Sequence, residues 1–254
     1  MTDASLPSIG IIVTAEQIPL LRDIIVAHNL DVYISDTQDT VLLDDQWKPW
    51  IRRVRPQRTH CTGAVWLMAP CYSWPDQHSH PRIRTIIAEQ LQSCIHMAVM
   101  LGATGLVLPI EQTQPAFRAR ISYYLSLIND QLSAHNLTLM IEIADTVDLD
   151  DLVQLTHELS HQYPLLIASH RDMNAHVINS NTICYAQFPI LEEEDDARLS
   201  PNWTLRYVVG ANENVSLIRK NIQWVQALIA HQNQPDIVAD EDTESDQQIT
   251  PRYG

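Results

Sequence analysis

The chain has 254 residues, of which 45% are hydrophobic and 19% are charged, and its formal net charge is −15. A globular chain of this length can bury a sizeable core, in one large domain or two small ones. No apolar run reaches the roughly 18 residues that a membrane span requires, so we expect no membrane partner. The N-terminal residues do not resemble a signal peptide, and the four cysteines form no CxxC pair. These features favour a cytoplasmic and also nuclear location.

Most of the negative charge lies in two short segments. Residues 192–196 contribute five acidic side chains and residues 236–246 contribute six more, which leaves the rest of the chain close to neutral. Such segments either are solvated and aid solubility, or attract arginine-rich protein segments. No basic stripe offsets them, which argues against direct nucleic-acid binding. We interpret 1–233 as the folded domain and 234–254, which has few apolar residues, as a disordered acidic tail or linker.

Short apolar runs alternate with longer amphipathic segments along the chain. The predicted strands are 9–13, 31–35, 64–68, 105–108, 138–143, 165–168, 183–186 and 205–209. Most are continuously apolar, which is typical of parallel strands buried on both faces. Helical spacing is found at 16–28, 82–101, 115–134, 149–161 and 214–231. This alternation predicts an α/β protein with a (β/α)8 TIM barrel, degenerate in the sixth and seventh units, where the connecting segments are short.

Barrels of this kind carry their chemistry at the C-terminal ends of the strands. The candidate metal ligands at these ends are Glu111, Glu142, His170 and Glu213. Two of the strand ends offer only apolar or weak groups, and no His-x-His or Glu-x-x-His pair lies on a strand. None of the six glycines forms a nucleotide-binding pattern. The sequence therefore favours a protein without a metal or an organic cofactor.

One strand residue is unusual on structural grounds. Glu142 lies inside the apolar run LMIEIAD, where a carboxylate must be paired or neutralised. It is either a buried acid bonded to a neighbouring strand or a functional residue.

The loop after the third strand, CYSWPDQHSHP, combines aromatic residues with two histidines. His78 and His80 have a spacing that can bind zinc in a suitable cage, but the loop is more typical of a protein-binding surface. Tyr72 and Trp74 are the expected partner contacts, because aromatic side chains are enriched at interface centres. The alternative is that Trp74 folds back and plugs the mouth of the barrel.

Five segments, in this order, resemble the N-terminal barrel of the type II protein arginine methyltransferase 5 family. They are DTVLLDDQWKPWIRR, WLMAPCYSWPD, LGATGLVLPIEQ, LMIEIAD and YVVGANEN. Trp47 matches the tryptophan of the family's second loop, and residues 98–110 match its small-residue helix and the strand that follows. The resemblance extends from about residue 9 to residue 231, which is nearly the whole predicted domain.

The resemblance implies an interaction role without chemistry. In that family the barrel is catalytically silent, resembles endonuclease IV and sugar-isomerase barrels, and precedes a separate S-adenosylmethionine-binding domain. This chain would then be a fragment or a stand-alone relative that recruits substrate adaptors or partner subunits and supports oligomer assembly, as in the methylosome. No activity or cofactor is expected from it alone. The alternative from another class is a metal-dependent barrel enzyme of the endonuclease IV or sugar-isomerase kind.

The resemblance also implies where partners bind. The family's partners are acidic adaptor peptides, a neighbouring methyltransferase subunit and a WD-repeat protein. Its peptide groove corresponds to Ser169, His170 and Arg171 after the sixth strand, with Asn221 and Gln226 of the last helix as the opposite wall. Members that bind the WD-repeat protein carry a long insertion between the fourth and fifth strands, and this chain has one compact helix there.

Overall fold

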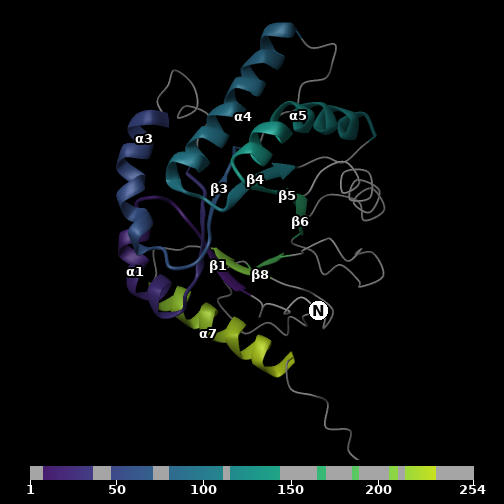
Figure 1. Ribbon diagram of the computed structural model, residues 1–254. Coiled ribbons are helices and arrows are strands. Elements are labelled where there is room, and N and C mark those ends of the chain that lie inside the picture. The colour runs from purple at the N-terminus through teal and green to yellow at the C-terminus, as the bar shows by residue number, and fades with distance from the viewer. Residues whose placement is uncertain are drawn as a thin grey trace, which may run out of the picture.

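The fold is built on parallel strands that alternate with helices (Figure 1). The computed structural model describes residues 8–36, 47–70, 80–110, 115–143, 165–169, 185–188, 206–210 and 215–232. The strands are β1 (Ser8–Val13), β2 (Asp31–Ile34), β3 (Val65–Met68), β4 (Gly105–Ile110), β5 (Thr138–Ile143), β6 (Leu165–Ser169), β7 (Tyr185–Phe188) and β8 (Arg206–Gly210). Each predicted strand overlaps one of these strands, although β7 shares only Tyr185 and Ala186 with the predicted range 183–186.

The strands form one sheet in the order β6-β5-β4-β3-β2-β1-β8-β7, and every pairing is parallel. Strand β1 pairs with both β2 and β8, so the first and last strands of the chain are neighbours. Strands β6 and β7, at the two ends of this order, also approach each other. The sheet is the TIM barrel that the sequence predicts.

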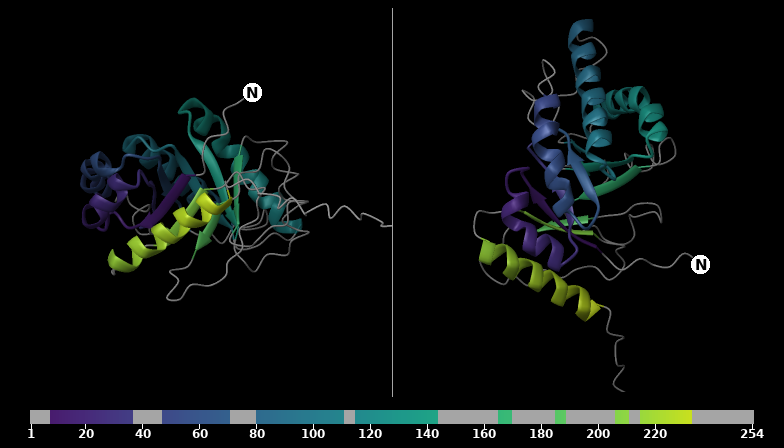
Figure 2. Two further views of the ribbon diagram at one scale, coloured as in Figure 1. Left: turned by 90° about the horizontal axis from the view of Figure 1, so that it is seen from below. Right: turned by 60° about the vertical axis from the view of Figure 1, so that its left-hand side comes forward.

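The helices pack outside the strands (Figure 2). They are α1 (Ile18–Ala27), α3 (Trp47–Val54), the 3-10 helix η1 (Arg55–His60), α4 (Pro81–Leu101), α5 (Pro115–Ala134) and α7 (Val215–Gln232). The predictions at 16–28, 82–101, 115–134 and 214–231 are confirmed, and α3 and η1 were not predicted. The helix predicted at 149–161, the sixth and seventh connections and the tail 234–254 lie outside the described residues. No helix that the structure describes is both long and apolar enough to cross a bilayer.

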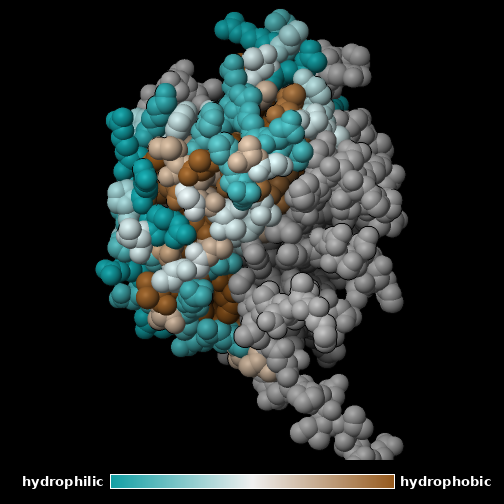
Figure 3. All heavy atoms as spheres, viewed as in Figure 1, coloured by the Kyte–Doolittle hydropathy of each residue, from teal (hydrophilic) through white to brown (hydrophobic). Residues whose placement is uncertain are grey.

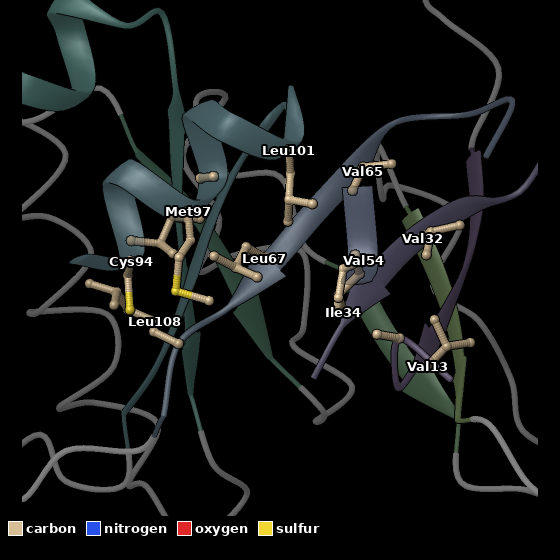
Figure 4. Close-up of a cluster of buried hydrophobic side chains, with 14 of the residues drawn as sticks. Val13, Val32, Ile34, Val54, Val65, Leu67, Cys94, Met97, Leu101 and Leu108 are labelled. Atoms are coloured by element: carbon tan, nitrogen blue, oxygen red, sulfur yellow. The ribbon is translucent and has the colours of Figure 1, made fainter. Parts of the chain in front are cut away.

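Two apolar layers bury the two faces of the strands. The outer layer includes Ile34, Leu67 and Leu108, which pack under helices that supply Val54, Cys94 and Met97 (Figure 4). The inner layer, in the lumen of the barrel, contains Tyr33, Trp66, Val107 and Met140. Because side chains alternate along a strand, burial on both faces explains why the strand sequences are continuously apolar.

Two stacked aromatic rings fill part of the lumen. Tyr33 and Trp66 are both fully buried, with ring centroids 5.9 Å apart and an interplanar angle of 7°. A glycine makes room on each side, because a Cβ atom on Gly10 would lie 2.5 Å from Tyr33 Cε2 and one on Gly105 would lie 2.6 Å from Trp66 Cζ3. Trp66 is in register with Gly105, the first residue of β4. We call this pair the aromatic floor, since it lies toward the N-terminal end of the barrel.

Candidate functional site

Glu142 lies near the C-terminal end of β5, on the lumen side of the sheet. It follows the lumen residue Met140 by two positions, so the alternation of side chains places both on the same face. Its register neighbours are Pro109 of β4 and Ala168 of β6. Only 8% of Glu142 is exposed. Glu142 is therefore buried, as a carboxylate inside an apolar strand is expected to be.

This position suits a carboxylate that acts on a ligand. The aromatic floor fills the lumen on the N-terminal side, and Glu142 lies beyond it, at the end where barrels of this class bind their ligands. A carboxylate shielded from water can accept hydrogen bonds from hydroxyl groups, accept a proton or ligate a cation. Asp31 is also buried, but it begins β2 at the opposite end, where its Oδ1 accepts a hydrogen bond from the Ala64 amide at 2.8 Å.

The described residues do not assemble a metal centre by themselves. No group of three His, Cys, Asp or Glu side chains that could hold an ion occurs among them. The other candidate ligands Glu111, His170 and Glu213 lie outside the described residues. At the C-terminal end of the lumen, the described residues thus provide one buried carboxylate, that of Glu142, where a full site for a hard divalent cation needs several ligands.

The rim of the barrel next to β1 and β2 is held by Asp36, which follows β2. Asp36 Oδ1 accepts a hydrogen bond from the Ala15 amide at 3.2 Å, and Oδ2 accepts one from Trp50 Nε1 at 3.3 Å. Ala15 belongs to the connection between β1 and α1, and Trp50 lies on α3. Both carboxylate oxygens are therefore used to fix the rim, a role that the sequence pattern did not indicate.

The residues predicted for a peptide groove do not come together in the described structure. Asn221 is buried, and its Nδ2 donates to the Leu217 carbonyl at 3.0 Å within α7. Gln226 Nε2 lies 3.1 Å from Nδ1 of His28, which follows α1 at the N-terminal end of the barrel. Ser169, by contrast, ends β6 at the C-terminal end.

Four other predicted site residues cannot be placed. They lie outside the described residues, and they are Tyr72, Trp74, His170 and Arg171.

Several solved structures share this fold. The TTHB071 protein from Thermus thermophilus, soaked with ZnCl2, has a TM-score of 0.60 and 12% identity over 90% of this chain and 100% of that protein. The 3-keto-D-glucoside 4-epimerase YcjR from E. coli has a TM-score of 0.60 and 14% identity over 87% and 99%. A D-tagatose 3-epimerase-like protein has a TM-score of 0.63 and 11% identity over 89% and 98%. No protein-family model and no curated protein matches the sequence.

These comparisons correct the predicted family and function. The similar structures include sugar epimerases and xylose isomerase domain proteins, and none of these is an N-terminal barrel of an arginine methyltransferase. The predicted membership of the methyltransferase family is wrong, and so is the predicted role as a non-catalytic domain that recruits adaptors. The motifs behind the resemblance, such as WLMAP, LVLPI and LMIEIAD, are buried strands with their flanking residues. Any barrel buried on both faces needs such runs, so their order and spacing reflect the βα repeat.

Proposed function

We propose that the chain is an enzyme of the sugar isomerase and epimerase kind, which acts on a carbohydrate at the C-terminal end of the barrel. The observation that carries the proposal is the buried carboxylate of Glu142 on the lumen side, near the end of β5. The similarity of the fold to sugar epimerases supports it. Glu142 is the residue to which we assign the acid–base role.

The chemistry of such a reaction needs what this site offers. Interconversion of hydroxy-carbonyl sugars begins when a base removes a proton from the carbon next to the carbonyl, whose electron pair then passes into an enediolate. The base must lie within hydrogen-bond reach of the proton on that carbon. A carboxylate that takes the proton becomes a carboxylic acid, and it gives the proton back to the enediolate in the second step of the reaction. The reaction is internally balanced, since it uses no oxidant or other co-reactant.

A divalent cation would fit this scheme. Bound beside Glu142, it would polarise the carbonyl and hydroxyl oxygens of the substrate. With Glu142 as the acid–base residue, other residues would have to hold the cation, and the part of the chain that the structure describes contains no group of three His, Cys, Asp or Glu side chains that could do so.

The charge of the chain favours a sugar substrate over a nucleic acid. The alternative prediction from the sequence was a metal-dependent barrel enzyme of either the endonuclease IV or the sugar-isomerase kind. The chain has a formal net charge of −15 and a sequence pI near 4.9. A polyanionic substrate would be repelled by this excess of negative charge, whereas a neutral sugar would not.

The test follows deuterium from solvent into a panel of ketoses by NMR and measures the divalent metal content of the purified protein by mass spectrometry. We expect incorporation at the carbon next to the carbonyl of at least one ketose. Glu142→Gln keeps the size of the side chain and removes its basicity, so it should slow incorporation by about 100-fold or more.

Asp31→Asn is the matched control, because Asp31 is also a buried carboxylate but lies at the opposite end of the barrel. It should lower stability and leave deuterium incorporation intact. A folded Glu142→Gln protein of native activity would remove Glu142 from the mechanism. A native protein that exchanges no ketose carbon, with or without added Mn²⁺ or Mg²⁺, would refute the proposed function.

A further inference from the structure

A basic surface lies on α3 and η1, although the chain as a whole is acidic. Residues 47–60 contain Lys48, Arg52, Arg53, Arg55 and Arg58 and no Asp or Glu. That is five of the sixteen Lys and Arg residues of the chain. We call the four arginines the arginine face. No basic stripe was expected from the sequence because the overall charge is acidic, and the arginine face was therefore missed.

Helix packing directs these arginines outward. Trp50, Ile51 and Val54 are buried in the core, so the positions between and after them point away from the barrel. Arg52, Arg53 and Arg55 are exposed, and Arg58 is half-buried. Strongly hydrophilic side chains accordingly lie along the left-hand edge of Figure 3, where Figure 1 places α3. Like charges three and four residues apart repel one another, and a negatively charged partner would relieve that repulsion.

The fold itself neutralises little of this charge. Arg53 Nη1 lies 3.9 Å from Glu16 Oε1, but both side chains are mostly exposed. Arg58 Nη1 donates a hydrogen bond to the Cys61 carbonyl at 2.7 Å. Within the ranges that the structure describes, Arg52 and Arg55 take part in no ion pair. The arginine face can therefore accept a partner without breaking a strong native contact.

The acidic segment 236–246 follows α7, whose C-terminal half contacts the end of α1. Gln226 of α7 contacts His28 after α1, and Thr62 after η1 bonds the Ile25 carbonyl of α1 at 3.5 Å. Helix α1 thus lies between α7 and the α3–η1 pair (Figures 1 and 2). Packed helices are spaced about 8–10 Å apart. An extended chain gains roughly 3.3–3.6 Å per residue, so residues 233–246 can span about 45 Å. The acids from Asp240 onward, which follow Gln232 by at least eight residues, can therefore reach the arginine face.

We propose that the acidic segment 236–246 docks on the arginine face of its own chain. Carboxylates form paired hydrogen bonds with guanidinium groups, so a segment with six acids matches a face with four arginines.

The experiment compares the natural 254-residue chain with an amide variant of the same length, in which the six acids of the segment become amides. Its substitutions are D236N, D240N, E241Q, D242N, E244Q and D246N. A fluorescent peptide of residues 234–248 is titrated with each protein at low ionic strength and followed by anisotropy. The peptide should bind the amide variant at least tenfold more tightly, because the natural segment competes for the same surface. Adding R52E and R55E to the amide variant should weaken binding at least tenfold, and high salt should abolish it.

The matched control for R52E and R55E is R219E with K220E, two exposed positions on α7 that change the charge equally. This pair should leave peptide binding intact. Equal peptide affinity for the natural chain and the amide variant would overturn the proposal, and so would insensitivity to R52E and R55E. A natural chain that is dimeric by light scattering, with a monomeric amide variant, would place the segment on a second copy instead. If a DNA oligonucleotide binds the natural chain as tightly as the amide variant, the arginine face is open to nucleic acid and not covered.

Discussion

At the scale of single residues, two glycines determine what can fill the lumen. Gly10 and Gly105 face the rings of Tyr33 and Trp66 at distances that leave no room for a side chain. The position of each glycine in the sequence carries no sign of this role, because the aromatic neighbours lie on other strands. The requirement becomes visible only when the strands are in register.

We predict that Gly105→Ala destabilises the protein more than Gly102→Ala. The new methyl group on Gly105 would collide with the Thr138 carbonyl oxygen and with Trp66, and overpacking of this kind costs about 1–3 kcal/mol. Gly102 ends α4 with a φ of 65°, and a methyl group there would meet no atom within 4 Å, so its cost is conformational, about 1 kcal/mol. Urea unfolding of both variants measures the difference. Equal stability of Gly105→Ala and the native protein would mean that the lumen is not packed in this way.

A second residue-scale prediction concerns alkaline pH. Burial raises the pKa of the Cys61 thiol, and Arg58 partly opposes this by lowering it. The folded state therefore holds the proton more tightly than the unfolded state. The stability that this provides is complete below pH 9.0, where an ordinary thiol titrates, and is lost as the pH rises through the folded-state pKa.

The free energy of unfolding should thus fall as the pH rises above 9.0, and less steeply in Cys61→Ala. Burial also raises the pKa of Tyr124, so some decline should persist in the variant. Urea titrations at each pH provide the measurement. An equal slope in the two proteins would show that Cys61 makes no contribution.

At the scale of elements, the contact of Asp36 with Trp50 joins α3 to the rim formed by β1 and β2. We predict that Asp36→Ala lowers the free energy of unfolding by about 1–3 kcal/mol, because the Ala15 amide and the indole N–H lose their acceptor. Trp50→Phe removes only the indole donor. A double-mutant cycle of the two should give a coupling energy of about 0.5–1.5 kcal/mol. Additive effects would mean that the two side chains do not interact.

The strands could be predicted from the sequence because burial on both faces makes each of them a continuous apolar run. The segment WKPWIRRVRPQRTH was not recognised as helical, since its prolines and five cations obscure an apolar stripe of only three buried residues. The sequence also did not indicate which strand residues face the lumen, because the residues on both faces of each strand are apolar. The inner and outer faces become distinct only when the sheet closes into a barrel, and a short stretch of sequence does not indicate that closure.

At the scale of the whole molecule, Glu142 was the part of the candidate site that the sequence could identify. A carboxylate in an apolar strand is conspicuous wherever the strand lies. Asn221 and Gln226 were assigned to a groove by resemblance to another family, and their amide groups are instead engaged with Leu217 and His28. Side-chain contacts between helices follow from packing in three dimensions, and alignment of short motifs did not predict them.

The aromatic floor has a kinetic consequence for the proposed enzyme. Tyr33 and Trp66 fill part of the lumen on its N-terminal side and so obstruct passage along the barrel axis toward that end. A sugar bound beside Glu142 must therefore arrive and depart through the same opening, and a product that has not yet left stands in the path of the next substrate. Turnover in such a one-ended chamber is sensitive to the escape rate of the product, so accumulated product should slow the forward reaction even far from equilibrium.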